Sequence, residues 1–276
     1  MRELLNLPER SRKPRSGGVT HVIDRGLSTA DIDGMIEVAG EFIDIVKLGW
    51  GTALATGNLE SKLERYREHG IPVVLGGTLT ELAIARGCLD ELIAWVHELG
   101  LDHFEIYDGT ISLEHERKLE LIERLAREFT VLSEVGSKDD TGAITPPYVW
   151  VQQMRAELGA GAWKVIAEGR EAGTAGIFRP SGEVREGLIG EIVHEIAPDQ
   201  IMFDAPRKDQ QVWFVRRFGP EVNLSNIPAG EVLALETLRL GLRSDTLGIV
   251  GRSAAPDGGA SVGSSAAPHG GASGVQ

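Results

Sequence analysis

The stretch Phe42-Ile43-Asp44-Ile45-Val46-Lys47-Leu48-Gly49-Trp50-Gly51 sets the pattern from which the fold is predicted. Its first seven residues are rich in isoleucine, valine and leucine, and the run ends against glycine, which is typical of a short buried strand followed by a tight turn. Side chains alternate between the two faces of a strand, so Lys47 shares a face with Ile43 and Ile45. The stretch therefore predicts a buried strand that closes on a lysine.

The same pattern recurs along the chain about every 25–30 residues, and amphipathic segments with a helical period fill the intervals. Eight such units favour an α/β fold, a single-domain (β/α)8 TIM barrel of about 250 residues. A doubly wound open sheet is the alternative, but no glycine-rich dinucleotide fingerprint follows the first strand. The predicted strands are Val19–Asp24, Phe42–Leu48, Pro72–Leu75, His103–Tyr107, Thr130–Val135, Trp163–Glu168, Gln200–Asp204 and Val222–Asn226.

The two ends of the chain differ from this pattern. Residues 1–18 have no lasting apolar period, so we expect a mobile or loosely docked arm before a barrel domain at residues 19–252. Residues 253–276 consist mostly of alanine, glycine, serine and proline, and an Ala-Ala-Pro segment nearly repeats within them. Such a segment buries too little apolar area to offset its ordering entropy, which predicts a disordered tail.

Composition limits the classes of partner. The 276 residues include 41 acidic and 28 basic side chains, for a net charge of −13, which disfavours nucleic acid and anionic lipid as principal partners. The single cysteine, Cys88, excludes an internal disulfide and a multi-thiolate metal site. The chain lacks a run of about 18 apolar residues and an apolar signal core. We therefore expect a cytoplasmic protein that contacts no membrane.

Polar side chains gather where the predicted strands end. Because the working residues of parallel barrels lie at the carboxyl ends of the strands and in the loops after them, these side chains are expected to share one pocket. Glu134, Glu168 and Asp204 each follow an apolar residue on the same strand face. Scattered surface charge is the competing interpretation. The set comprises Lys47, Glu105, Glu134, Lys138, Glu168, Arg170, Asp204, Lys208, Asn223, Ser225 and Asn226.

The acids in this set predict a divalent ion. Mg²⁺ binds one or two carboxylates together with water and substrate oxygens, so we predict Mg²⁺ as the cofactor. The alternative for each acid is a salt bridge to a neighbouring lysine or arginine. The lysine and arginine side chains at the same end of the barrel predict an anionic substrate. The candidate metal ligands are Glu105, Glu134, Glu168 and Asp204.

The last predicted strand carries a second candidate subsite. Barrels often build a phosphate site from the loops after strands seven and eight, which is where Asn223, Ser225 and Asn226 stand. Capping of the following helix is the other interpretation of these side chains.

Several motifs recur at spaced positions along the barrel region. They are the stretch at residues 42–52, which begins with the run quoted above, Gly76-Gly77-Thr78-Leu79, Ser133-Glu134-Val135-Gly136, Glu168-Gly169-Arg170-Glu171, Ala205-Pro206 with Lys208 and Gln210-Gln211, Val222-Asn223-Leu224, and Leu235-Glu236-Thr237-Leu238-Arg239 with Gly241-Leu242-Arg243 and Asp245-Thr246. Together these motifs, over about residues 19–250, resemble one known family, phosphosulfolactate synthase. The resemblance implies a (β/α)8 barrel, dependence on Mg²⁺, a homotrimer, and addition of sulfite to phosphoenolpyruvate in coenzyme M biosynthesis. The family is also similar to plant heat-stress-associated proteins.

The resemblance also suggests roles for single residues. Lys138 matches a lysine in the family's Glu-Val-Gly segment and is predicted as the general acid. Lys47, Arg170 and Lys208 are candidates for holding the anionic groups of the substrates. Three positions depart from the family pattern: Tyr107 stands for a common serine, Asp204 for a common glutamate, and Arg207 for a usual glutamine.

Two other functions fit the sequence. One is a Schiff-base aldolase that acts on a phosphorylated substrate through Lys47 or Lys164, although Lys164 opens its predicted strand. The other is a stress-associated interaction protein that has retained the barrel fold but has lost catalytic activity.

Overall fold

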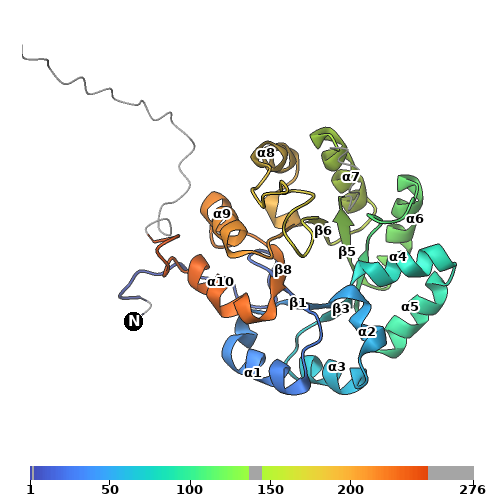
Figure 1. The fold of residues 1–276 in the computed structure, drawn as a ribbon, viewed down its shortest axis with the longest axis horizontal. Coiled ribbons are helices and arrows are strands. Elements are labelled where there is room, and N and C mark those ends of the chain that lie inside the picture. Colours follow the sequence, from blue (N-terminus) through green and yellow to red (C-terminus); the bar gives the residue numbers. More distant parts are fainter. Residues whose placement is uncertain (2, 137–144, 248–276) are drawn as a thin grey trace, which may run out of the picture.

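The computed structural model describes residues 1, 3–136 and 145–247, and these fold as a ring of helices around parallel strands (Figure 1). The strand order is β3-β2-β1-β8-β7-β6-β5-β4, so each strand lies beside its neighbours in the sequence, β8 lies beside β1, and the chain steps around the ring in a single direction. The strands are β1 Thr20–Asp24, β2 Ile45–Leu48, β3 Val73–Leu75, β4 His103–Ile106, β5 Thr130–Val135, β6 Lys164–Ala167, β7 Ile201–Asp204 and β8 Leu224–Pro228.

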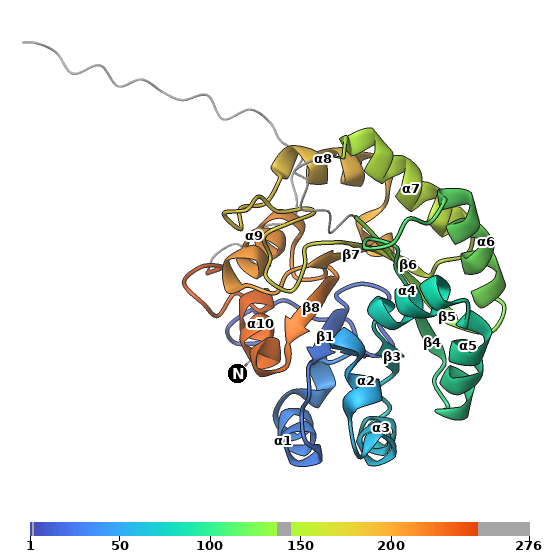
Figure 2. The ribbon, with the colours of Figure 1, turned by 45° about the vertical axis from the view of Figure 1, so that its right-hand side comes forward.

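The helices lie outside the strands, as Figure 2 shows from a second direction. They are α1 Thr29–Ala39, α2 Thr52–Ala55, α3 Leu59–Glu68, α4 Gly77–Arg86, α5 Leu89–Glu98, α6 His115–Leu125, α7 Pro147–Gly159, α8 Glu186–Glu195, α9 Lys208–Phe218 and α10 Val232–Arg239. Short 3-10 helices cover Gly40–Phe42, Gly49–Gly51, Pro198–Gln200 and Ala229–Glu231.

The barrel closes through side chains between β3 and β4. These end strands lie against each other, and no pairing ladder joins them within the described residues. Instead the N–H of Gly77 donates to Glu105 Oε1 at 2.7 Å, and Thr80 Oγ1 donates to the Glu105 carbonyl at 2.7 Å. The start of α4 thus bridges the gap. The predicted barrel is confirmed in a nearly closed form, and the open-sheet alternative is not formed.

All eight predicted strands are present, with shifted ends. The largest shift is in the stretch that begins at Phe42, where a 3-10 helix occupies Gly40–Phe42 and the strand begins only at Ile45. The Asp44 carboxylate explains the late start, because it pairs with Arg15 at 2.9 Å and accepts the N–H of Thr20 at 2.9 Å. The N–H of Asp44 also donates to the carbonyl of Thr20 at 3.0 Å, so the chain first pairs with β1 at this anchor, just before β2 begins.

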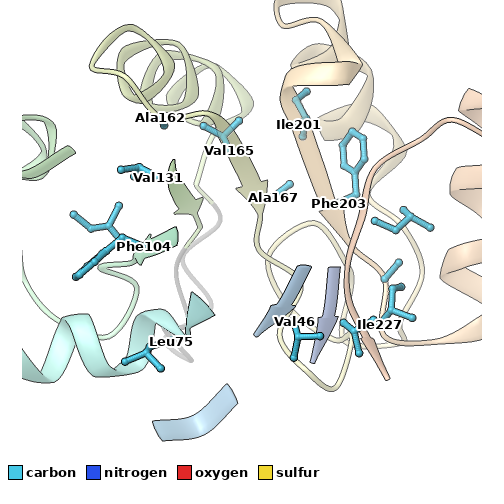
Figure 3. Close-up of a cluster of buried hydrophobic side chains, with 14 of the residues drawn as sticks. Val46, Leu75, Phe104, Val131, Ala162, Val165, Ala167, Ile201, Phe203 and Ile227 are labelled. Carbon is cyan, nitrogen blue, oxygen red and sulfur yellow. The ribbon is translucent and has the colours of Figure 1, made fainter. Parts of the chain in front are cut away.

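Two apolar layers hold the strands. The larger layer lies between the strands and the helices, and Figure 3 shows part of it, including Val46, Phe104 and Phe203. The smaller layer fills the barrel interior with one side chain from each of six segments. It consists of Val19, Ile45, Val74, Leu132, Ile166 and Met202. Two residues after four of these apolar side chains, the same strand face carries a charged one. These charged residues are Lys47, Glu134, Glu168 and Asp204. The apolar layer therefore lies directly beneath a charged opening at the carboxyl ends of the strands, here called the mouth.

The N-terminal arm is held more firmly than predicted. Arg10 pairs with Glu236 at 3.1 Å and with Glu221, and Arg15 pairs with Asp44. Lys164, at the start of β6, donates to the carbonyl of Ser16 at 2.8 Å. These contacts place the arm at the amino ends of the strands, away from the charged mouth. The predicted tail at residues 253–276 lies outside the described residues.

The helices of the described residues are all too short or too polar to cross a lipid bilayer.

One buried residue makes stability depend on pH. His21 lies inside the barrel at 0% exposure, and neither ring nitrogen has a hydrogen-bond partner among the described residues. Burial, helped by the charges of Lys47 and His103, lowers the pKa of His21 well below 6.5. Below pH 6.5 the unfolded chain therefore binds a proton that the folded chain does not, and stability falls as the pH falls.

We expect His21→Leu to reduce this loss. Between about pH 7.5 and about pH 5.5, the variant should lose about 1 kcal/mol less free energy of unfolding than the wild type. Urea unfolding at the two pH values measures the difference, and exposed His194→Leu is the matched control, expected to follow the wild type. Equal losses in the His21 variant and the wild type would contradict the prediction.

Candidate active site

The carboxyl ends of the strands surround a small hollow of about 40 Å³. Because successive strands are parallel, side chains that are far apart in sequence reach the same rim. Six predicted site residues line the hollow, namely Lys47, Glu105, Glu134, Glu168, Arg170 and Asn226.

Three carboxylates form the centre of this mouth. One oxygen from each of Glu134, Glu168 and Asp204 lies within 4.8 Å of the others, and all three residues are buried. Ser225 Oγ donates to Asp204 Oδ1 at 2.6 Å, and the N–H of Gly169 donates to Asp204 Oδ2 at 2.9 Å. The donor set consists of oxygens only, which suits a hard cation such as Mg²⁺.

Like charges at this spacing repel one another. Burial, followed by the charge of Glu134, raises the pKa of Asp204 from 3.8 to about 7, although Lys47, Ser225 and Gly169 act in the opposite direction. A divalent cation would remove the same repulsion that a proton removes. The residues present therefore fit a metal ion.

Lys47 and Glu105 form a buried ion pair beside the three carboxylates. Their charged atoms are 3.2 Å apart, and both side chains are almost fully buried. Burial opposes the charge on Lys47, but Glu105, Glu134, Asp204 and Glu168 outweigh it and raise the pKa of the lysine. Glu105 also accepts the N–H of Gly77. Glu105 lies outside the group of three carboxylates, so its predicted role as a metal ligand stays a prediction.

This ion pair disfavours the Schiff-base alternative. A Schiff base needs a neutral amine, whereas the carboxylates around Lys47 keep it charged. Lys164, the other lysine considered, lies at the amino ends of the strands, where its ammonium donates to the carbonyls of Ser16 and Asp199. Neither lysine has the environment of an aldolase nucleophile.

Two of the predicted site residues in the lining have unusual backbones. Arg170 and Asn226 have φ angles of 56° and 55°, which are uncommon for residues with a side chain. Asn226 lies in a bulge of β8, where the register against β1 shifts by one residue. The bulge turns its side chain into the mouth, and Asn226 Oδ1 is buried without a hydrogen-bond partner among the described residues. It is thus available to a substrate donor.

The other predicted site residues lie elsewhere. Asn223 is at the amino ends of the strands, where its side chain accepts the N–H of Val19 at 3.0 Å and donates to the carbonyl of Ile201 at 3.0 Å. Lys208 begins α9, is about half exposed, and pairs with Asp245 at 2.8 Å. The structure therefore does not bring Asn223 or Lys208 into the mouth. Lys138 lies outside the described residues.

Two aromatic residues at the mouth were not among the predicted site residues. Tyr107 is fully buried and lines the hollow, and burial, followed by Glu168 and Glu134, raises the pKa of its hydroxyl, which stays protonated. Trp50 has a φ of 56° and forms the half-exposed rim, with the Arg25 guanidinium 5.2 Å from its ring centre. The position of Tyr107 directly after the fourth strand is the signal that could have identified it.

We expect Glu168→Gln to have opposite effects without and with metal. In EDTA the variant should be at least as stable as the wild type, because one of three mutually repelling carboxylates is gone. In MgCl₂ the wild type should gain about 2.7 kcal/mol of unfolding free energy at 100 times the dissociation constant, and the variant much less.

Urea unfolding in the two buffers measures this difference. Glu81→Gln is the control, because Glu81 is buried and accepts the N–H of Thr110 outside the three-carboxylate group. Equal gains from MgCl₂ in the wild type and in Glu168→Gln would contradict the metal assignment.

The fold of the chain is similar to that of solved enzymes. A solved 3-hexulose-6-phosphate synthase from Salmonella typhimurium superposes with a TM-score of 0.53 at 14% identity, over 82% of this chain and 100% of the other. At that identity the likeness concerns the fold alone.

The sequence comparisons are more specific. A phosphosulfolactate synthase of Bacillus subtilis (strain 168) is 41% identical over 244 residues, which are 88% of this chain and 97% of the relative. Protein HEAT-STRESS-ASSOCIATED 32 of Arabidopsis thaliana is 22% identical over 84% of this chain and 88% of its own length. The sequence model of the family described as (2R)-phospho-3-sulfolactate synthase matches residues 8–245, and with them all eight strands. The chain therefore belongs to the phosphosulfolactate synthase family of lyases.

Proposed function

We propose that the chain catalyses the Mg²⁺-dependent addition of sulfite to phosphoenolpyruvate, which gives 2-phospho-3-sulfolactate. The observation that carries the proposal is the group of three buried carboxylates beside Lys47 and Arg170, in a chain 41% identical to a phosphosulfolactate synthase. The mouth thus offers ligands for a hard cation and positive side chains for anionic substrates.

The chemistry sets clear demands on these residues. Sulfite is a good nucleophile without a base, and its sulfur forms a bond to the methylene carbon. The π electrons of the double bond then move toward the carboxylate of phosphoenolpyruvate, and the carbon that bears the phosphate needs a proton. Glu134, Glu168 and Asp204 are the residues that would hold Mg²⁺, which supplies positive charge for that carboxylate.

Lys47 contributes a fixed positive charge. Its ammonium is held by Glu105 and stays protonated, so it stabilises negative charge that develops during the addition without any rearrangement. Arg170 lines the same hollow, and its guanidinium is suited to a phosphate or a carboxylate. Asn226 Oδ1 and the protonated Tyr107 hydroxyl add an acceptor and a donor to the wall.

Lys138 remains the proposed general acid. It follows Gly136, whose backbone lies so close to Glu168 that a Cβ at Gly136 would stand 2.5 Å from the Cβ of Glu168. Gly136, two residues before Lys138 in the sequence, thus lies directly beside the carboxylate group.

A stress-associated protein without turnover is the second candidate, and the comparisons favour the enzyme. Identity to the synthase is 41%, against 22% to the heat-stress protein. The buried carboxylates also have no structural need to lie within 4.8 Å of one another. The homotrimer, the role in coenzyme M biosynthesis and the cytoplasmic location stay predictions.

Incubation of the purified chain with phosphoenolpyruvate, sulfite and MgCl₂ tests the reaction. We expect mass spectrometry to detect phosphosulfolactate, and EDTA to abolish it. Folded protein that forms no product in MgCl₂ would overturn the proposal.

Lys138→Ala tests the general acid. It should lower kcat by about 100-fold or more at an unchanged melting temperature, because a positioned acid contributes about that much to a proton transfer. Lys13→Ala is the matched control, since Lys13 lies in the N-terminal arm and donates to the carbonyl of Gly40. Full activity of Lys138→Ala would remove this residue from the mechanism and leave the metal assignment standing.

A further inference from the structure

A buried lysine outside the barrel reaches the backbone of a proposed metal ligand. Lys118 lies on α6 and is 1% exposed. Its ammonium donates to the carbonyl oxygen of Glu134 at 2.8 Å and to Asp108 Oδ1 at 2.9 Å, and it pairs with Glu157 Oε1 at 2.9 Å. The three partners belong to the end of β5, the loop after β4, and α7.

Lys118 donates to the Glu134 carbonyl at a point where the ladder between β4 and β5 has already ended. The carbonyls of Val131 and Val135 accept hydrogen bonds from Trp163 and Glu168 on the β6 side. Successive carbonyls along a strand point to opposite sides, so the carbonyl of Glu134 points the other way, toward β4. The ladder between β4 and β5 ends at the pair Ile106 and Ser133, one residue earlier. Lys118 takes the place of the missing strand partner.

The ammonium is itself held in place. Glu157 is 1% exposed and accepts a hydrogen bond from Ser133 Oγ at 2.6 Å, so both the lysine and its main partner are tied to β5. Burial opposes the charge on Lys118, but Glu157 and Asp108 outweigh it and raise the pKa of the lysine. The result is a permanent cation fixed behind the strand end.

We propose that Lys118 is a positioning residue that sets the place of the Glu134 carboxylate, and through it the affinity of the mouth for Mg²⁺. The inference rests on the proposed role of Glu134 as a metal ligand. Groups that orient metal ligands commonly change metal affinity or activity by 10–100-fold when they are removed. Through Asp108, the same ammonium fixes the loop that follows Tyr107.

Lys118→Met tests the inference, with Lys62→Met as the matched control. Lys62 is also a buried lysine on a helix outside the barrel, 2% exposed and paired with Asp24 at 2.9 Å at the end of β1. Both variants should lose stability in urea. Isothermal titration with MgCl₂ should give an affinity at least about tenfold weaker for Lys118→Met, and an affinity within about twofold of the wild type for Lys62→Met.

A double variant separates position from stability. Lys118→Met with Glu157→Gln removes the buried carboxylate that the single change leaves unpaired, so it should recover part of the stability. It should not recover Mg²⁺ affinity, since the Glu134 carbonyl still lacks its donor. If Mg²⁺ affinity returns with stability, or if Lys118→Met binds Mg²⁺ like the wild type, the inference is overturned.

A third measurement stands apart from the proposed function. Amide hydrogen exchange at residues 133–136 is measured without metal, and the free energy of opening is compared with the global free energy of unfolding of the same variant. Relative to that global value, the exchange should be faster in Lys118→Met than in Lys62→Met. Equal exchange would overturn the positioning role. A wild-type chain that binds no Mg²⁺ would overturn the proposed metal site instead, and the exchange result would still decide the part played by Lys118.

Discussion

The rest of the structure depends on the crowding of negative charge at the barrel mouth. Four buried carboxylates lie near the ammonium of Lys47, namely Glu105, Glu134, Glu168 and Asp204. Only Glu105 forms an ion pair with Lys47 among the described residues. Backbone and hydroxyl donors stabilise two of the others: the N–H of Arg170 donates to Glu168 at 2.7 Å, and Ser225 and the N–H of Gly169 donate to Asp204. Neutral donors reduce the repulsion but do not cancel it, so the mouth is built to take up a cation or a proton.

The mouth needs a rigid support, because repulsion between the carboxylates would push flexible strand ends apart. The interior apolar layer beneath the carboxylates fixes the strands from below. Behind the strand ends, buried lysines of the outer helices hold the strands from outside, Lys62 at Asp24 and Lys118 at Glu134. The site thus combines anions inside the barrel with cations behind it.

Much of the fold and part of the site could be predicted from the sequence, because alternation along a strand is local. It places Lys47, Glu134 and Glu168 correctly above their apolar neighbours. It says nothing about height along the barrel axis, which depends on the register between strands, and Asn223 therefore lies at the far end. Lys118 gave no signal, since the partners of a helical lysine are set by the packing of three other segments.

The aspartate at position 204 follows from the same geometry. Both of its oxygens are already engaged, one by Ser225 and one by the N–H of Gly169, and each keeps a lone pair for a cation. The Cβ of Asp204 is so close to Gly169 that a Cβ added to the glycine would stand 2.9 Å from it. A glutamate here would extend the carboxylate by one methylene, away from these two donors and toward Glu134 and Glu168. The shorter side chain therefore keeps its oxygens on fixed donors and leaves space between the carboxylates that a cation could take.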